Sequence, residues 1–331
     1  AKNSFSHLTQ VLLDEIKHCI DRGEQTILFL NRRGFSTFVT CKNCAETIKC
    51  PHCDITLTYH KSNKMLRCHY CGYATPLPKV CPNCGEEALS DLGVGTEKIE
   101  EELHTLLPYA RVLRMDVDTT SRKGAHKKMI EAFRNHEYDI LLGTQIVAKG
   151  LDFPDVTLVG VVNADTSLNI PDFRSSENTY SLLSQVAGRS GRSDKQGKVL
   201  IQTFNPDHYA ISYVKHHDYL GFYKEEMFVR RKLGYPPYYY LCYIKISGKD
   251  AKYIFQEALK IKQSLERMLE HTTILGPTSL PIFRVNNIYR YGIILKYKKE
   301  DRLRQDLFRV KNHYKTNNKV RIDIDFSPSH F

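Results

Sequence analysis

The sequence predicts an α/β domain with a parallel sheet, a cysteine-rich insertion within that domain, and a smaller α+β domain at the C-terminal end. Short apolar runs alternate with amphipathic helical patterns, a rhythm typical of a parallel sheet wrapped by helices. Eight of the ten cysteines lie between residues 41 and 84. The breaker cluster L-G-Y-P-P-Y at 233–238 marks a second boundary. We therefore expect an α/β domain over residues 1–38 and 89–230, an insertion over 39–88, and a C-terminal domain over 231–331.

The α/β domain is expected to begin with a helix and a buried strand. Apolar residues at helical spacing from Leu8 to Ile20 predict a first helix, which Gly23 ends. The apolar run T-I-L-F-L at 26–30 is typical of a buried parallel strand. Beyond the insertion, the same patterns predict helices over 96–107, 121–134, 176–187 and 207–216, and strands over 111–115, 139–143, 156–162 and 198–204.

The insertion contains four C-x-x-C pairs, each of which places two thiolates on one tight turn. Two such turns supply the four sulfur ligands that zinc prefers, so we expect two structural zinc ions. A disulfide framework is disfavoured because the first residues lack signal-peptide character. The pairs are Cys41 with Cys44, Cys50 with Cys53, Cys68 with Cys71, and Cys81 with Cys84.

The grouping of the four pairs is open between two arrangements. Residues 55–59 alternate in a strand pattern and Lys61 to Lys64 can turn, so a hairpin between Cys53 and Cys68 favours a zinc ribbon with two nested sites. Interleaved pairs are the alternative. Three histidines are further candidate ligands, but with eight thiolates at hand each is expected to be a surface residue: His52, His60 and His69.

The C-terminal domain is strongly basic. Residues 231–331 hold 20 Lys and Arg against 9 Asp and Glu, an excess equal to the net charge of the whole chain, +11. Such a patch favours an anionic polymer as partner, and tyrosines among cations can stack on unpaired bases. We expect strands over 239–247, 291–297 and 321–326, and helices over 251–269 and 301–313. The candidate DNA contacts are Arg284, Arg290, Tyr289 and Tyr291, with Lys296, Lys298 and Lys299 close in sequence.

The composition is ordinary for a soluble globular protein, with 41% hydrophobic and 26% charged residues. No run of about eighteen apolar residues is present, so no membrane span is expected. Metal-bound, reduced cysteines predict a cytoplasmic protein, and a monomer is expected. The absence of an initiator Met suggests a piece of a longer chain.

Two segments of the α/β domain carry groups suited to phosphate chemistry. The first, G-T-Q-I-V-A-K-G-L-D-F at 143–153, follows a buried strand, and its hydroxyl, amide, lysine and glycines could contact phosphates. The second, Q-V-A-G-R-S-G-R at 185–192, ends a helix and presents two arginines that could neutralise a γ-phosphate. Taken alone, the second segment could be only a glycine-rich helix terminus with cations.

Together and in this order the two segments resemble motifs V and VI of superfamily 2 helicases, and L-N-R-R-G at 30–34 resembles motif IV. The inserted cysteine module narrows the resemblance to the primosomal replication-restart helicases, which R-M-D-V-D-T at 114–119 and the cluster at 233–238 also resemble. The resemblance implies the second RecA-like lobe of an ATP-driven motor that moves 3′ to 5′ on DNA. It also implies recognition of forked and single-stranded DNA, nucleoid association, and work with single-stranded DNA-binding protein and helicase-loading proteins.

Carried over residue by residue, the resemblance implies that Arg192 is an arginine finger, with Arg189 its companion on the phosphates. Gln185 would help to position the attacking water. A tracked DNA strand would touch Thr144 and Gln145, next to the Lys149 that could contact phosphates. Gly150 and Asp152 would couple that contact to the nucleotide.

One departure from the family pattern is large. The sequence contains no G-x-x-x-x-G-K-[ST] loop and no acidic box, so half of a site for ATP and Mg²⁺ is missing. We expect this chain alone to be inactive as an ATPase and to be the C-terminal half of an enzyme. The alternative from another class is a non-enzymatic, zinc-containing DNA-binding adaptor whose α/β lobe is a scaffold.

Overall fold

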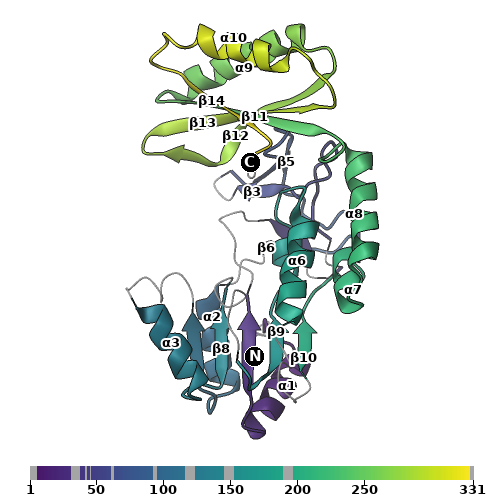
Figure 1. Ribbon diagram of the computed structural model, residues 1–331, viewed down its shortest axis with the longest axis vertical. Coiled ribbons are helices and arrows are strands. Elements are labelled where there is room, and N and C mark those ends of the chain that lie inside the picture. Colours follow the sequence, from purple (N-terminus) through teal and green to yellow (C-terminus); the bar gives the residue numbers. More distant parts are fainter. Residues whose placement is uncertain are drawn as a thin grey trace. The chain divides into compact units, whose positions relative to one another are not determined.

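The computed structural model describes residues 6–30, 38–41, 43–44, 46–60, 63–91, 95–115, 124–144, 153–188 and 197–328 (Figure 1). The chain forms two compact units. The first contains Ala1–Phe35, Leu92–Asn169 and Arg174–Phe222, and the second contains Ser36–Asp91, Ile170–Phe173 and Tyr223–Phe331. The cysteine insertion and the C-terminal domain therefore belong to the same unit. The three-domain boundaries expected from the sequence stay a prediction.

A five-stranded parallel sheet forms the centre of the first unit, in the order β10-β9-β1-β8-β7. Its middle strand, β1, is buried at every residue, which explains its uninterrupted apolar sequence. The parallel α/β fold is thereby confirmed. The strands are β1 (Gln25–Phe29), β7 (Val112–Met115), β8 (Ile140–Gly143), β9 (Val156–Val161) and β10 (Lys198–Ile201).

Helices cover both faces of this sheet. Successive residues of β1 point to opposite faces, so this strand contributes side chains to the packing on each side. Leu28 packs with apolar residues of α1 and α2, whereas Ile27 and Phe29 pack with residues of α3, α6 and α7. The approach of α1 is close: a Cβ at Gly160 of β9 would lie 2.9 Å from Leu12 Cδ1. The helices are α1 (Gln10–Asp21), α2 (Thr96–Leu106), α3 (Ala125–Arg134), α5 (Asp165–Leu168), α6 (Ser175–Ala187) and α7 (Tyr209–Lys215).

The insertion is closed at its base by β2 (Val39–Cys41), which pairs antiparallel with β6 (Leu89–Asp91). Within it, β3 (Thr58–His60), β4 (Met65–Arg67) and β5 (Ala74–Pro76) form a small antiparallel sheet. The hairpin expected between Cys53 and Cys68 is thus present as β3 and β4.

The C-terminal domain is a four-stranded antiparallel sheet in the order β12-β13-β11-β14, with α9 and α10 on one face (Figure 1). On the other face, Leu241 and Ile294 pack against apolar residues of the insertion, among them Leu57 and Leu66. The elements are β11 (Tyr240–Gly248), α9 (Ala251–Met268), β12 (Thr272–Val285), β13 (Ile288–Tyr297), α10 (Leu303–His313) and β14 (Arg321–Phe326).

Several elements were not predicted from the sequence: the short α5, β2, β5 and β6, and the longer β12 and α8 (Tyr219–Leu233). Strand β12 contains Pro277 and Pro281, which lie where its pairing with β13 is irregular. An edge strand tolerates proline at such positions, but the two prolines obscure the alternation that would predict a strand. Helix α8 keeps large apolar side chains in solvent, so its periodicity is obscured; Tyr219, Leu220 and Phe228 are each at least 60% exposed. No helix of the described residues combines the length and apolarity needed to cross a membrane.

Candidate functional site: two four-cysteine centres

The structure gathers the eight insertion cysteines into two groups, and within each group the four Sγ atoms lie within 4.8 Å of one another. The Sγ–Sγ separations include 3.5 Å between Cys50 and Cys71, and 3.6 Å for both Cys41–Cys84 and Cys44–Cys81. Four thiolates about 2.3 Å from a zinc ion form a tetrahedron with edges of about 3.8 Å. The grouping is nested: Cys41, Cys44, Cys81 and Cys84 form the outer site, and Cys50, Cys53, Cys68 and Cys71 form the inner site.

The turns that carry these cysteines direct backbone N–H groups at the sulfur atoms. Tyr70 N lies 3.4 Å from Cys68 Sγ, and Tyr73 N lies 3.5 Å from Cys71 Sγ. Hydrogen bonds to sulfur favour the charged thiolate that a metal needs. Gly72 closes the inner turn at φ +85°, a conformation that glycine adopts without strain. Four clustered thiols with N–H donors around them fit structural zinc at both sites.

The three nearby histidines lie outside both ligand groups. His52 is exposed, as expected, but the expectation that His69 is a surface residue is wrong, because its side chain is buried. The His69 ring faces the C-terminal domain, where Nδ1 donates to the carbonyl oxygen of Ser279 at 2.7 Å. Burial lowers the pKa of His69 to about 4. The neutral ring then leaves Nε2 to accept from His60 Nε2, 3.3 Å away.

Residues of the inner site form hydrogen bonds with the C-terminal domain. The Tyr235 hydroxyl donates to the backbone oxygen of Cys53 at 3.1 Å, and Thr278 Oγ1 lies 3.5 Å from the backbone oxygen of Cys68. Tyr235 is buried and stacks on Phe173 with ring centres 4.8 Å apart. Backbone atoms of two zinc-ligand residues thus receive hydrogen bonds from the C-terminal domain and the segment that leads into it.

Two of the predicted motor residues lie within the described part of the chain. Thr144 is half-buried just after β8, at the edge where the parallel strands end. Gln185 is exposed near the end of α6 and donates to Ser181 Oγ at 3.2 Å. The other six lie outside the described residues, so their roles stay predictions: Gln145, Lys149, Gly150, Asp152, Arg189 and Arg192.

The predicted DNA contacts of the C-terminal domain do not form one surface. Tyr291 packs on Phe255 of α9, on the helix-covered face, and Arg290, next to it in β13, points to the opposite face. At the tip of the β12–β13 hairpin, the Arg284 guanidinium lies over the Tyr289 ring, 5.4 Å from its centre. Lys296 is half-buried, and its ammonium group already has partners within the protein. Its Nζ lies 4.0 Å from the Tyr235 ring centre and donates to Leu233 O. These residues are close in the sequence, but they do not gather into one basic patch on the surface.

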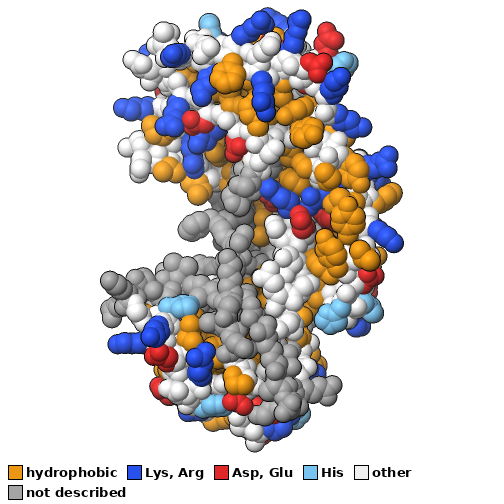
Figure 2. Space-filling model, in the orientation of Figure 1, with side chains coloured by type: hydrophobic (Ala, Val, Ile, Leu, Met, Phe, Trp, Pro, Cys, Tyr) orange, Lys and Arg blue, Asp and Glu red, His pale blue; other side chains and the backbone are white. Residues whose placement is uncertain are grey.

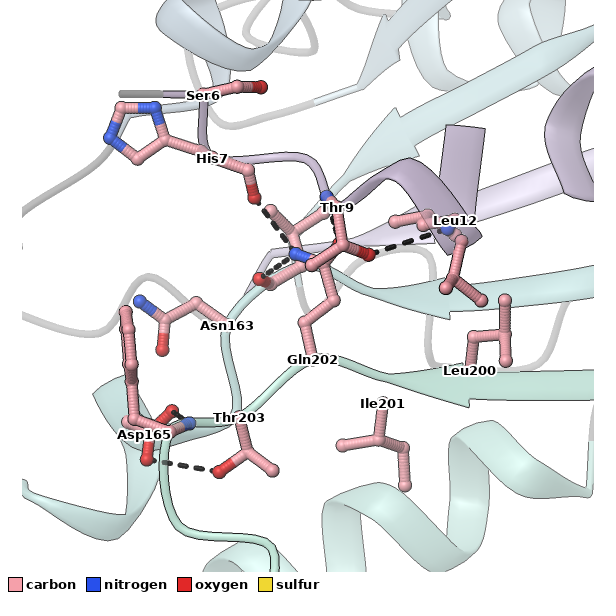
Figure 3. Close-up of a pocket in the computed structure, with 13 residues that line it drawn as sticks. Ser6, His7, Thr9, Leu12, Asn163, Asp165, Leu200, Ile201, Gln202 and Thr203 are labelled. Atoms are coloured by element: carbon pink, nitrogen blue, oxygen red, sulfur yellow. Dashed lines mark hydrogen bonds between the residues drawn. The ribbon is translucent and has the colours of Figure 1, made fainter. Parts of the chain in front are cut away.

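A separate cavity of about 470 Å³ lies in the first unit, beside the start of α1 and the ends of β9 and β10 (Figure 3). None of the predicted site residues lines it. Its polar groups largely bind one another. The buried carboxylate of Asp165 accepts from Thr203 Oγ1 and Phe204 N, at 3.1 and 2.9 Å. The Gln202 amide accepts from Thr9 N at 2.9 Å and donates to the His7 and Val162 carbonyl oxygens, at 2.8 and 2.7 Å.

Gln202→Ala is expected to lower the free energy of unfolding of the first unit by about 2–3 kcal/mol, because it removes several hydrogen bonds and leaves backbone groups unpaired. Urea unfolding, with hydrogen exchange to resolve α1, measures the change. Gln185→Ala is the control, since an exposed glutamine with one side-chain hydrogen bond should change stability by less than about 0.5 kcal/mol. Equal effects of the two substitutions would contradict the anchoring role of Gln202.

Three family models match different parts of this chain. Residues 94–194 match the helicase conserved C-terminal domain, residues 50–76 match the PriA DNA helicase Cys-rich region, and residues 231–329 match the primosomal protein N C-terminal domain. Solved structures also resemble the chain, among them the yeast DEAD-box splicing factor Prp28. That likeness covers 68% of this chain and 34% of Prp28, at 14% identity and a TM-score of 0.31, and is too weak to support a conclusion.

The fold and these matches define a helicase C-terminal lobe with an inserted zinc-ribbon module and a further C-terminal domain. The replication restart protein PriA of Bacillus subtilis is 50% identical over 96% of this chain, and that of Synechocystis is 41% identical over 99%. The chain belongs to the PriA family of replication restart proteins and corresponds to their C-terminal part. It spans 40% and 39% of the length of these two relatives.

Proposed function

We propose that this chain is the second motor lobe and the C-terminal DNA-binding part of an ATP-dependent DNA helicase that moves 3′ to 5′ and starts replication restart at forked DNA. The observation that carries the proposal is one arrangement: a parallel RecA-like sheet whose first strand is followed by a double four-cysteine module. The sequence relatives, which are named replication restart proteins, support the same role.

The places of Thr144 and Gln185 in the fold support the proposed roles of the motor residues. Thr144 follows β8 directly, so the segment that it opens begins at the carboxyl edge of the parallel sheet, where ligands of such sheets bind. Gln185 lies near the end of α6, directly before the segment that carries Arg189 and Arg192. We assign Arg192 to the charge that develops on the transferred phosphoryl group, Arg189 to the phosphates, and Gln185 to the attacking water.

The two cysteine sites would each hold one structural zinc ion, with Cys₄ ligation and no open coordination position. Zinc would supply the rigidity of the insertion and, through Cys53 and Cys68, of its contact with the C-terminal domain. Partners in this proposal are forked and single-stranded DNA, single-stranded DNA-binding protein, and proteins that load the replicative helicase.

The proposal is tested by comparing this chain with a longer product of the same reading frame that includes the region before residue 1. The longer protein should hydrolyse ATP in a DNA-stimulated manner, whereas this chain, which lacks a phosphate-binding loop, should show only background hydrolysis. Phosphate release with and without forked DNA measures both. A longer protein that binds DNA but never hydrolyses ATP would establish the adaptor alternative instead.

A further inference from the structure

Among the described residues, neither the helices nor the insertion covers one part of the C-terminal sheet. On the face away from α9 and α10, Leu241 and Ile294 pack against the cysteine module. Further along β11 on the same face, Lys245 and Ser247 lie at the floor of a cleft of about 940 Å³. The cleft continues to the tip of the β12–β13 hairpin, where Val285 and Ile288 add apolar surface.

Five cationic side chains line this cleft, and they come from three places in the chain, residues 245–249, residue 290 and residues 319–321: Lys245, Lys249, Arg290, Lys319 and Arg321. Close backbone packing brings two of these places together. A Cβ at Gly248 would lie 2.3 Å from the carbonyl oxygen of Lys319, so only glycine fits and the segments of Lys249 and Lys319 lie side by side. Figure 2 shows how Lys and Arg side chains gather over this domain.

The two carboxylates of the cleft already have partners. Asp250 caps α9 by accepting from Tyr253 N at 3.0 Å. Asp323 accepts from Arg321 Nε at 3.1 Å and lies 3.5 Å from Lys245 Nζ. Arg290 donates to the backbone oxygen of Ile282 through one terminal nitrogen, whereas its Nε is buried and has no hydrogen-bond partner within the described part of the chain. The cleft therefore keeps an excess of cationic donors.

We propose that this cleft binds consecutive phosphates of a single DNA strand, with Lys249, Lys319 and Arg290 as the main contacts. Lysine and arginine donors beside a serine hydroxyl are the groups that contact phosphate oxygens in DNA complexes, and the apolar hairpin tip can contact sugars or unstacked bases. The inference rests on the proposed DNA-binding function and assigns it to other residues: of the four contacts predicted for this domain, only Arg290 lines the cleft.

The test is a double charge reversal, Lys249→Glu with Lys319→Glu, in the whole 331-residue chain. Both side chains are exposed, so folding should be unaffected. The matched control is Lys311→Glu with Lys315→Glu, two exposed lysines at and just beyond the end of α10, which covers the opposite face. Fluorescence anisotropy with a labelled oligothymidylate, and with a blunt duplex of equal length, gives affinities over a salt series.

We expect the cleft variant to bind the oligothymidylate at least about tenfold more weakly at low salt. The slope of log affinity against log salt should become shallower by about 0.7 for each phosphate that the variant no longer binds, and the control should stay near the wild-type slope. Equal weakening in both variants would overturn the inference, because only net charge would then matter. So would a cleft variant that loses binding to polyglutamate but keeps its binding to DNA, or one that loses only duplex binding.

The failure of the inference can be told from failure of the proposed function. If the wild-type chain binds DNA and Arg284→Glu weakens that binding while the cleft variant does not, the strand lies on the hairpin tip and the cleft assignment is wrong. If the wild-type chain binds neither oligothymidylate nor duplex at low salt, the DNA-binding function of this domain fails, and the cleft assignment falls with it.

Discussion

Arg192→Ala in the longer protein, which we propose hydrolyses ATP, is expected to slow DNA-stimulated hydrolysis by about 10³- to 10⁵-fold. The physical reason is that an arginine finger acts on charge that develops only in the transition state, so its loss lowers turnover more than it weakens nucleotide binding. Single-turnover phosphate release measures the rate, and the binding of a fluorescent nucleotide measures the affinity.

The matched control is Arg134→Ala, which removes an exposed arginine from the end of α3 in the same unit. Hydrolysis in that variant should stay near the wild-type rate. Near-normal turnover after Arg192→Ala would contradict the finger assignment, and a large loss after Arg189→Ala alone would then transfer the role to that residue. A parallel loss of nucleotide affinity would instead indicate a binding contribution common to the ground and transition states.

Cys68→Ser is expected to have the largest effect on stability, because structural zinc contributes apparent folding free energies on the order of 10 kcal/mol per site. The wild-type chain should hold two zinc ions by elemental analysis and the variant one. The variant should also loosen β11 to β14, since Cys68 lies on the turn whose His69 and backbone oxygen contact Ser279 and Thr278.

Cys84→Ser is the matched comparison, with the same chemistry at the outer site. It should also lose one zinc ion, yet leave hydrogen exchange in the C-terminal sheet close to wild type. The reason is that four residues around the inner site make hydrogen bonds with that domain and the segment leading into it: Cys53, Arg67, Cys68 and His69. Equal loosening by the two substitutions would contradict the special role of the inner site.

The sequence predicted much of this architecture because the strongest signals are local. The apolar run of β1, the strand–helix rhythm and the C-x-x-C turns each depend on residues close in sequence. Nesting of the cysteine pairs followed from the hairpin between Cys53 and Cys68, which the structure contains as β3 and β4.

What sequence patterns missed depends on contacts between distant segments. His69 is buried and donates a hydrogen bond to the carbonyl oxygen of Ser279, 210 residues later in the chain. No local sequence pattern reveals such a contact. Tyr291 and Arg290 looked like one patch because they are adjacent, but strand alternation sends them to opposite faces. The cleft likewise gathers Lys249 and Lys319 through packing at Gly248, where the only local signal was a glycine at the end of an apolar strand.

The closure of the insertion by β2 and β6 has a consequence for how quickly the sheet can form. Strand β1 must find β8, with Ile27 opposite Leu141, across a chain segment of about 110 residues. Once β2 and β6 pair, the metal-loaded insertion no longer counts toward that loop, which shrinks to roughly half its length. Halving a flexible loop lowers its closure cost by only about 0.6 kcal/mol, or about threefold in rate. Without metal, strand pairing in the first unit should therefore slow by no more than about threefold, whereas the insertion itself depends on metal to fold.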